Sequence, residues 1–211
     1  MLGTIGDQIM ANRALVPDQE LWSAWTPAEL AVRLKAVSLP WCVVGGWALD
    51  LWRGEKTREH DDIEFTMLRD DFPAFRHALG DLDMYTAKSG VLTFLPLGHI
   101  PGLDIHQVWC FDPVAQAWRV DMMIESGSPE VWVYKRDEAI RFPRAEMLYL
   151  SREGIPYLRP AAILLFKAQH VRPKDEEDFH KTLPTLPDEE VAWLRQHLLK
   201  LHPGHHWITP S

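Results

Sequence analysis

The stretch Val43-Val44-Gly45-Gly46-Trp47-Ala48-Leu49-Asp50, followed by Arg58-Glu59-His60-Asp61-Asp62-Ile63-Glu64-Phe65, decides the fold of this chain. Its pattern is typical of a buried strand, a glycine pair, a short helix and then a second strand with acids at alternate positions. Glycines at a helix start let backbone N–H groups approach a phosphate, where the helix dipole favours negative charge. An isolated glycine pair more often only permits close packing, so the phosphate interpretation depends on the acids that follow.

Asp62 and Glu64 are two residues apart in a predicted strand over 62–67, so their side chains are expected to project from one face. Ile63 and Phe65 alternate with them and are expected to face the core. Adjacent carboxylates repel unless a cation or proton lies between them, and Mg²⁺ prefers oxygen ligands from carboxylates and substrate phosphates. The pattern therefore predicts a cation site, although a polar edge strand would show the same alternation.

A third acid lies in the apolar stretch Trp118-Arg119-Val120-Asp121-Met122-Met123. A carboxylate in such a strand is costly without a partner, and a cation shared with Asp62 and Glu64 would supply one. Near a substrate hydroxyl, Asp121 is also a candidate general base. Asp104 is the alternative third carboxylate, and the sequence leaves the choice open.

Composition bounds the class of protein. The chain has 211 residues, 46% of them hydrophobic and 25% charged, which suits a globular protein with a real core. Its net charge of −8 argues against nucleic acid and anionic membranes as partners, and suits a cationic small molecule. Residues 1–11 lack a signal-peptide pattern and no apolar run is long enough to span a bilayer, so we expect a cytoplasmic protein.

The order of predicted elements indicates an α+β fold with a mixed sheet, flanking helices and a C-terminal helical part. We expect a core with N-terminal helices over 1–128 and a mainly helical part over 129–211. The predicted helices are 26–37, 47–52, 71–79, 161–170, 175–181 and 188–201. The predicted strands are 41–44, 62–67, 84–87, 91–95, 103–111, 117–124 and 131–134.

The motif Gly45-Gly46-Trp47-Ala48-Leu49-Asp50, then Thr57-Arg58 and His60-Asp61-Asp62-Ile63-Glu64, resembles the nucleotidyltransferases of the DNA polymerase β-like superfamily. The nearest branch is that of the small adenylyltransferases that modify aminoglycosides and lincosamides. Their motif is a strand, Gly-Gly or Gly-Ser, a helix and then Asp-x-Asp. Here Glu64 replaces the second Asp, which keeps the carboxylate but lengthens its side chain.

The resemblance implies an enzyme that transfers a nucleoside monophosphate, AMP from ATP or the equivalent from another nucleoside triphosphate, onto a hydroxyl of a small acceptor. An aminoglycoside-like cation is one such acceptor, and the biological role would be antibiotic resistance. Mg²⁺ would be held by Asp62 and Glu64, with Asp121 as base or shared ligand.

The resemblance also implies which residues contact the nucleotide. Gly45, Gly46 and the N–H of Trp47 would hold the triphosphate. Arg58 is a phosphate contact in this interpretation, because a guanidinium matches phosphate oxygens in bidentate fashion. Lys167 and Lys174 would reach the nucleotide from the helical part. The alternative interpretation is that both are ordinary solvated lysines on helices.

Two further hypotheses stay open from the sequence. One is transfer of AMP to a protein, as in toxin–antitoxin members of the superfamily. The other is a catalytically inactive fold retained as a nucleotide-binding or interaction module. The presence of three candidate acids favours an enzyme.

Overall fold

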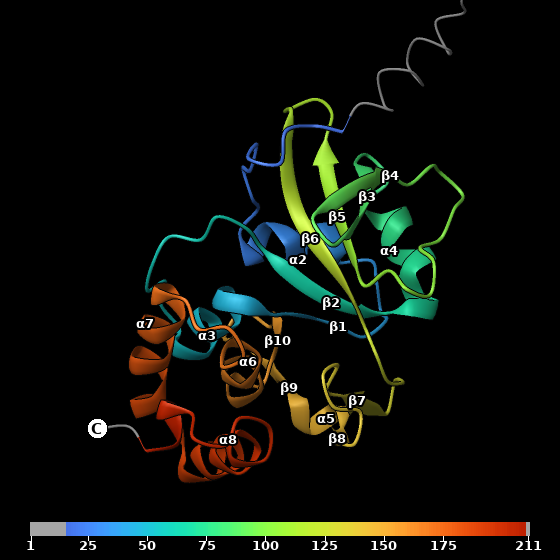
Figure 1. Ribbon diagram of the computed structural model, residues 1–211. Coiled ribbons are helices and arrows are strands. Elements are labelled where there is room, and N and C mark those ends of the chain that lie inside the picture. Colours follow the sequence, from blue (N-terminus) through green and yellow to red (C-terminus); the bar gives the residue numbers. More distant parts are fainter. Residues whose placement is uncertain (1–15, 210–211) are drawn as a thin grey trace, which may run out of the picture. The chain divides into compact units, whose positions relative to one another are not determined.

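The computed structural model describes residues 16–209, which divide into two compact units (Figure 1). Among the described residues, the first unit comprises 16–40 together with 61–126, and the second comprises 41–60 together with 127–209. The chain passes from the first unit to the second after residue 126. Residues 41–60, predicted to be part of the core, instead group with the C-terminal segment. The N-terminal stretch 1–25 was expected to be helical in part; residues 1–15 lie outside the described residues, and residues 16–25 form no helix.

The first unit is built on a mixed sheet with the strand order β4-β3-β5-β6-β2. Parallel pairing joins β2 to β6, and the other neighbours are antiparallel. The predicted strands 103–111 and 117–124 are present as the antiparallel pair β5 and β6, but β5 begins at residue 107 rather than 103. The strands of this unit are β2 (Glu64–Leu68), β3 (Asp83–Lys88), β4 (Val91–Phe94), β5 (Gln107–Asp112) and β6 (Ala117–Glu125).

One face of this sheet is apolar and buried. Alternate residues of three adjacent strands are all buried on it, as the period of two requires. Their members are Phe65, Met67, Val108, Cys110, Val120, Met122 and Ile124. Helix α4 (Phe72–Ala78) packs here through Phe75, whose ring lies 5.7 Å from that of Phe65. Helix α2 (Pro27–Leu34), which starts with a capping box at Thr26, contacts α4.

The opposite face carries a row of side chains that changes from aromatic to acidic. Directly opposed residues in neighbouring strands share a face. Tyr85 opposes Trp109, Trp109 opposes Asp121, and Asp121 opposes Glu64. The predicted alternation of acids and apolar residues in β2 is therefore confirmed for Glu64 and Phe65.

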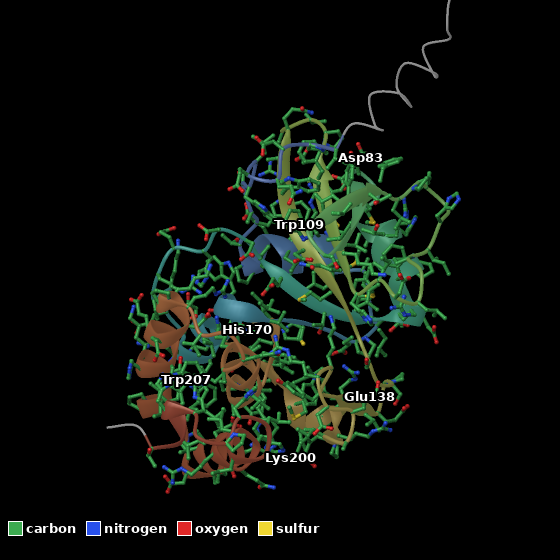
Figure 2. The ribbon with its side chains drawn as sticks, viewed as in Figure 1. Asp83, Trp109, Glu138, His170, Lys200 and Trp207 are labelled. Atoms are coloured by element: carbon green, nitrogen blue, oxygen red, sulfur yellow. The ribbon has the colours of Figure 1, made fainter. Side chains whose placement is uncertain are left out.

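An irregularity between β5 and β6 extends the aromatic part of that face. Cys110 opposes Val120 but Phe111 opposes Trp118, so β6 contains one extra residue at this point. The extra residue turns Trp118 to the side of Trp109, with 5.4 Å between ring centroids. Trp118 is fully buried and also contacts the rings of Trp22, Tyr85 and Phe111. The labelled Trp109 in Figure 2 marks this face of the unit.

The second unit combines short strands with the C-terminal helices, drawn in orange to red in Figure 1. Strand β1 (Trp41–Val43) is parallel to β10 (Pro156–Leu158), which is antiparallel to β9 (Leu148–Leu150). Strands β7 (Val131–Val133) and β8 (Arg141–Pro143) form a separate hairpin. The helices of this unit are α3 (Gly45–Arg53), α5 (Arg144–Met147), α6 (Pro160–Lys167), α7 (Pro173–Thr182) and α8 (Asp188–Leu201).

Helix α6 is the centre of the second unit. It begins with Pro160, whose fixed backbone angle suits a first helical turn, and its residues 160–165 are all buried. Helices α3, α7 and α8 all contact it. Residues 41–60 group with this unit because β1 pairs with β10 while α3 packs on α6 and α7.

The predicted α+β class is confirmed, with a mixed sheet and flanking helices. Strands β8, β9 and β10 could not be predicted from the sequence, because strands of three residues are too short to show an alternating pattern. Within residues 16–209, no helix combines the length and apolarity needed to cross a membrane.

We predict that Trp118→Ala destabilises the protein by about 3–5 kcal/mol, the usual cost of removing a fully buried tryptophan side chain. The change removes four ring contacts and the hydrogen bond from the indole Nε1 to the carbonyl of Asp18. Urea unfolding measures the loss. Val114→Ala, at a position 92% exposed, is the control and should change stability little. A loss below about 1 kcal/mol for Trp118→Ala would contradict this account of the core.

Candidate active site

The first unit brings two of the three predicted acids side by side. Glu64 on β2 and Asp121 on β6 are directly opposed in a parallel pair. Asp62 was predicted to lie within the strand, but β2 starts at Glu64 and Asp62 precedes it. The main-chain pairing nevertheless continues, because the N–H of Asp121 donates to the carbonyl of Ile63 at 2.9 Å. Asp62 therefore lies next to the pair without belonging to the strand.

Asp121 is the most perturbed of these carboxyls. Its side chain is buried, with a relative exposure of 2%. Burial raises the pKa of Asp121 well above its ordinary value, and repulsion from Glu64 and, more weakly, from Asp62 raises it further. The side-chain amide of Gln107 donates a hydrogen bond to Oδ2 of Asp121, and this contact lowers the pKa in part. The indole of Trp109 also lowers it.

The second oxygen of Asp121, Oδ1, is buried and has no hydrogen-bond partner within the described part of the chain. The same holds for the indole Nε1 of Trp109, on the strand beside it. An unpartnered buried carboxylate oxygen is costly, and such a group needs a proton, a donor or a cation. Asp121 thus has the environment expected of a functional carboxyl.

Asp104, the alternative third carboxylate, lies elsewhere in the first unit. It precedes β5 in an exposed loop and pairs with Lys88 at 2.5 Å. This lysine holds the pKa of Asp104 below its ordinary value. The side chain of Asp104 is 66% exposed, whereas that of Asp121 is buried opposite Glu64.

The fit of a metal ion depends on these same side chains. Across residues 16–209, no three or more His, Cys, Asp and Glu side chains are grouped so as to hold a metal ion. The donor set of Asp62, Glu64 and Asp121 nevertheless suits Mg²⁺, which prefers carboxylate oxygens. The unpartnered Oδ1 of Asp121 and its repulsion by both other acids are the features that an added cation would relieve. The metal assignment stays a prediction.

The predicted phosphate turn lies in the second unit. Helix α3 begins at Gly45, two residues earlier than predicted, and no side chain caps its first turn. Gly45 has a φ of 67°, a backbone conformation that favours glycine. The first N–H groups of a helix have no acceptor within it. The backbone at Gly45, Gly46 and Trp47 therefore offers the uncapped helix start that the phosphate interpretation requires.

Gly46 also has a packing role. A Cβ at this position would lie 2.4 Å from Nη2 of Arg58 and 2.6 Å from Cε1 of His60. The ring of Trp47 stacks on that of His60, with 4.3 Å between centroids. The absence of a side chain at Gly46 therefore lets Arg58 and His60 approach the start of α3.

Arg58, a predicted phosphate contact, is bound by a carboxylate of its own unit. Its Nε and Nη2 donate to the two oxygens of Asp178 on α7, at 2.9 and 3.0 Å. These hydrogen bonds are the main reason that the pKa of Arg58 is raised. The guanidinium is thus oriented beside Gly46 by a bidentate pair.

Lys167 extends this group of charges. It lies at the end of α6 with a side-chain exposure of 9%, and pairs with Asp175 at 2.7 Å and Asp178 at 3.0 Å. A solvated helix position is therefore excluded for Lys167. Lys174 is half-buried on α7. We call Arg58, Asp178, Lys167 and Asp175 the charge network of the second unit.

Two acids of this region, Asp50 and Asp178, were not predicted from the sequence to be partners of its basic side chains. Asp50, within α3, accepts hydrogen bonds from Thr57 and pairs with Nε2 of His60, both at 2.6 Å. Asp178 lies in the run of four acids at 175–178, yet it is buried in the charge network. A buried acid inside an apolar helix, as at Asp50, was the available signal. No pattern in the sequence indicated that Asp178 pairs with Arg58, which lies 120 residues away along the chain.

Comparisons with known proteins show what this chain is similar to. Residues 28–111 match a family model described as aminoglycoside-2''-adenylyltransferase. No curated protein matches the sequence significantly. The solution structure of the antibiotic-resistance factor ANT(2'')-Ia aligns with a TM-score of 0.52 at 18% identity, covering 85% of this chain and 94% of that one. The chain is therefore similar to this adenylyltransferase family over part of its length and shares the fold of a solved member.

Two further structures have the same fold. The crystal structure of ANT(2'')-Ia in complex with adenylyl-2''-tobramycin aligns with a TM-score of 0.54 at 18% identity, covering 82% of this chain and 94% of that one. The lincomycin-bound lincosamide adenylyltransferase LnuA aligns with a TM-score of 0.50 at 14% identity, covering 76% and 95%. The predicted resemblance to the aminoglycoside and lincosamide adenylyltransferase branch is therefore confirmed.

We predict that Asp178→Asn destabilises the protein by about 3–5 kcal/mol at neutral pH, because it leaves Arg58 without its buried counter-charge and Lys167 with Asp175 alone. Burial raises the pKa of Asp178, but hydrogen bonds from Arg58 and attraction to Lys167 outweigh it, so the net pKa is lowered. Its stabilising contribution is thus present above the unfolded pKa of about 4 and is lost as the pH falls through the folded value.

Urea unfolding of the whole chain between pH 7 and the acid limit tests this. Asp178→Asn should show a flatter loss of stability below about pH 4 than the unsubstituted protein. Asp104→Asn is the matched control, because its pair with Lys88 is exposed and screened by solvent. Equal pH dependence in all three proteins would argue against the charge network as a stabilising element.

Proposed function

We propose that this nucleotidyltransferase uses Mg²⁺ to transfer AMP from ATP to a hydroxyl of a small, cationic, hydroxylated acceptor, and that it acts in the cytoplasm. The observation that carries the proposal is Asp121, a buried carboxyl with an unpartnered oxygen, opposed by Glu64 in a sheet shared with adenylyltransferases. A purely structural acid would not be expected to keep one buried oxygen unpartnered beside two other carboxylates.

In this proposal Asp62, Glu64 and Asp121 hold Mg²⁺, with Asp121 also a candidate base for the acceptor hydroxyl. The bound metal would supply positive charge that offsets the charge of the reacting phosphate. The raised pKa of Asp121 makes it a better proton acceptor than an ordinary aspartate once it is ionised. Glu64 and Asp62 supply the negative charge that attracts the cation.

The uncapped start of α3 would bind the triphosphate through the N–H groups of Gly45, Gly46 and Trp47. Arg58 is oriented beside Gly46 and would add a guanidinium contact, although it must share its donors with Asp178. Lys167 and Lys174 would contribute positive charge from α6 and α7. The charge network holds Arg58 and Lys167 in defined positions, which lowers the entropic cost of using them.

The acceptor is proposed from charge and from the fold. A net charge of −8 favours a cationic acceptor over an anionic one. The similar structures carry adenylylated tobramycin and lincomycin, which supports an amino-sugar antibiotic or a related hydroxylated amine. Antibiotic resistance is the biological role that this acceptor class implies.

Pyrophosphate release from ATP with Mg²⁺, measured across a panel of aminoglycosides, lincosamides and simple polyols, tests the proposal. Turnover with at least one cationic hydroxylated acceptor is expected, and mass spectrometry should find the product heavier by one AMP. No turnover with any acceptor, together with no Mg²⁺-dependent ATP binding, would overturn it. AMP transfer to protein substrates alone would support the protein-modifying alternative instead.

We predict that Asp121→Asn lowers kcat by about 10²–10⁴-fold, the usual contribution of a positioned base. Thermal stability should not fall, because Asn removes a buried charge that Glu64 and Asp62 repel. Asp104→Asn, the change at the alternative carboxylate, should retain kcat within about twofold, since Asp104 is exposed and paired with Lys88. Retained activity in Asp121→Asn and lost activity in Asp104→Asn would reverse the assignment.

We predict that Gly46→Ala weakens ATP binding by about tenfold or more, because the added Cβ displaces Arg58 and His60 from the start of α3. Calorimetry with a non-hydrolysable ATP analogue measures the change. Gly98→Ala is the control for introducing an alanine, since no atom lies within 4 Å of a Cβ there, although its positive φ adds some strain. Unchanged affinity in Gly46→Ala would remove the glycine turn from the nucleotide site.

A further inference from the structure

The two carboxylate oxygens of Asp121 have different environments. Oδ2 accepts a hydrogen bond from the side-chain amide of Gln107, while Oδ1 is buried and unpartnered among the described residues. A carboxylate can rotate about its last bond unless a donor selects one orientation. Gln107 therefore supplies a contact that distinguishes the two oxygens.

The register of the sheet explains why a glutamine makes this contact. Gln107 opposes Met123, so it is a diagonal neighbour of Asp121, two residues along β6. Diagonal neighbours are about 7–8 Å apart and only long side chains bridge them. The residue directly opposite Asp121 is Trp109, and on the other side it is Glu64. Glu64 is an acid and cannot donate to Asp121. The indole of Trp109 lowers the pKa of Asp121 but makes no hydrogen bond of ordinary geometry with it, so the hydrogen bond to Oδ2 comes from Gln107.

We propose that Gln107 is a positioning residue, which holds Oδ2 of Asp121 so that Oδ1 is the oxygen presented to Mg²⁺ and to the acceptor hydroxyl. The inference rests on the proposed function of Asp121. Gln107 itself contacts neither substrate nor metal. It acts through the orientation of the carboxylate, in the same way that partners of metal ligands generally orient them.

Neither an acid nor an apolar residue could take the role of Gln107. Its neutral amide donates without adding to the negative charge of Asp62, Glu64 and Asp121. A glutamate there would place a fourth acid in contact with Oδ2 and would lack the donor. A leucine would keep the approximate volume but leave Oδ2 without its partner.

The test uses Gln107→Leu and Gln107→Glu in the full-length protein. Gln107→Leu should lower kcat by about 10–100-fold, with the KM for ATP within about twofold, because no proposed phosphate contact is altered. Mn²⁺ affinity, measured by electron paramagnetic resonance without substrate, should fall by a similar factor. Gln107→Glu should lower kcat at least as much as Gln107→Leu, because it also loses the donor.

Gln19→Leu is the matched control. It removes another glutamine amide from the same unit, one that donates to the carbonyl of Gly90 at an exposed position. This variant should retain kcat and Mn²⁺ affinity. Circular dichroism and thermal unfolding of every variant establish that the fold is intact before binding is compared.

The outcomes separate this inference from the proposed function. If the unsubstituted protein binds Mn²⁺ and transfers AMP, but Gln107→Leu matches it in kcat and Mn²⁺ affinity, the positioning role is overturned and the function stands. A variant that loses only thermal stability, with both readouts unchanged, overturns the positioning role in the same way. If the unsubstituted protein neither binds Mn²⁺ nor transfers AMP, the proposed function fails and the positioning role fails with it.

Discussion

The parallel pairing of β2 with β6 is the constraint on which the first unit depends. It places Glu64 directly beside Asp121, although like charges at such short range oppose each other. The opposite face of the same strands is fully apolar and packs on α4, so neither strand can shift by one residue without exposing that core. The hydrophobic face therefore holds the two acids in an arrangement that their charges alone would disfavour.

In the second unit it is positively charged side chains that are held in place. Arg58 and Lys167 converge on Asp178, and Lys167 also pairs with Asp175. These contacts are mostly screened from water, which makes them stronger and makes loss of one member costly. Gly46 provides room for Arg58 and His60 at the start of α3. One glycine pair thus combines an uncapped helix start with close packing, the two roles between which the sequence could not choose.

The parts of the fold that depend on a local sequence pattern could be predicted from the sequence. The helix 188–201 was placed correctly at both ends, and the alternation of Glu64 and Phe65 identified the acidic face of β2. Prediction was less accurate where the signal was weak. Asp62 was predicted to lie in β2, but this strand starts two residues later, at Glu64. Strand β5 was predicted to start four residues before its actual first residue. Both errors lie at strand ends, where pairing with a neighbour rather than propensity sets the limit.

The sequence by itself determined the α+β class, the glycine turn and the three candidate acids, because each depends on residue type and short spacing. Only the tertiary structure showed that Gln107 contacts Asp121, that Asp178 pairs with Arg58, and that residues 41–60 pack with the C-terminal helices. These contacts depend on strand register and helix packing between distant segments. The free energy that selects them comes from burying apolar faces together, and no local pattern in the chain encodes which polar side chains then meet.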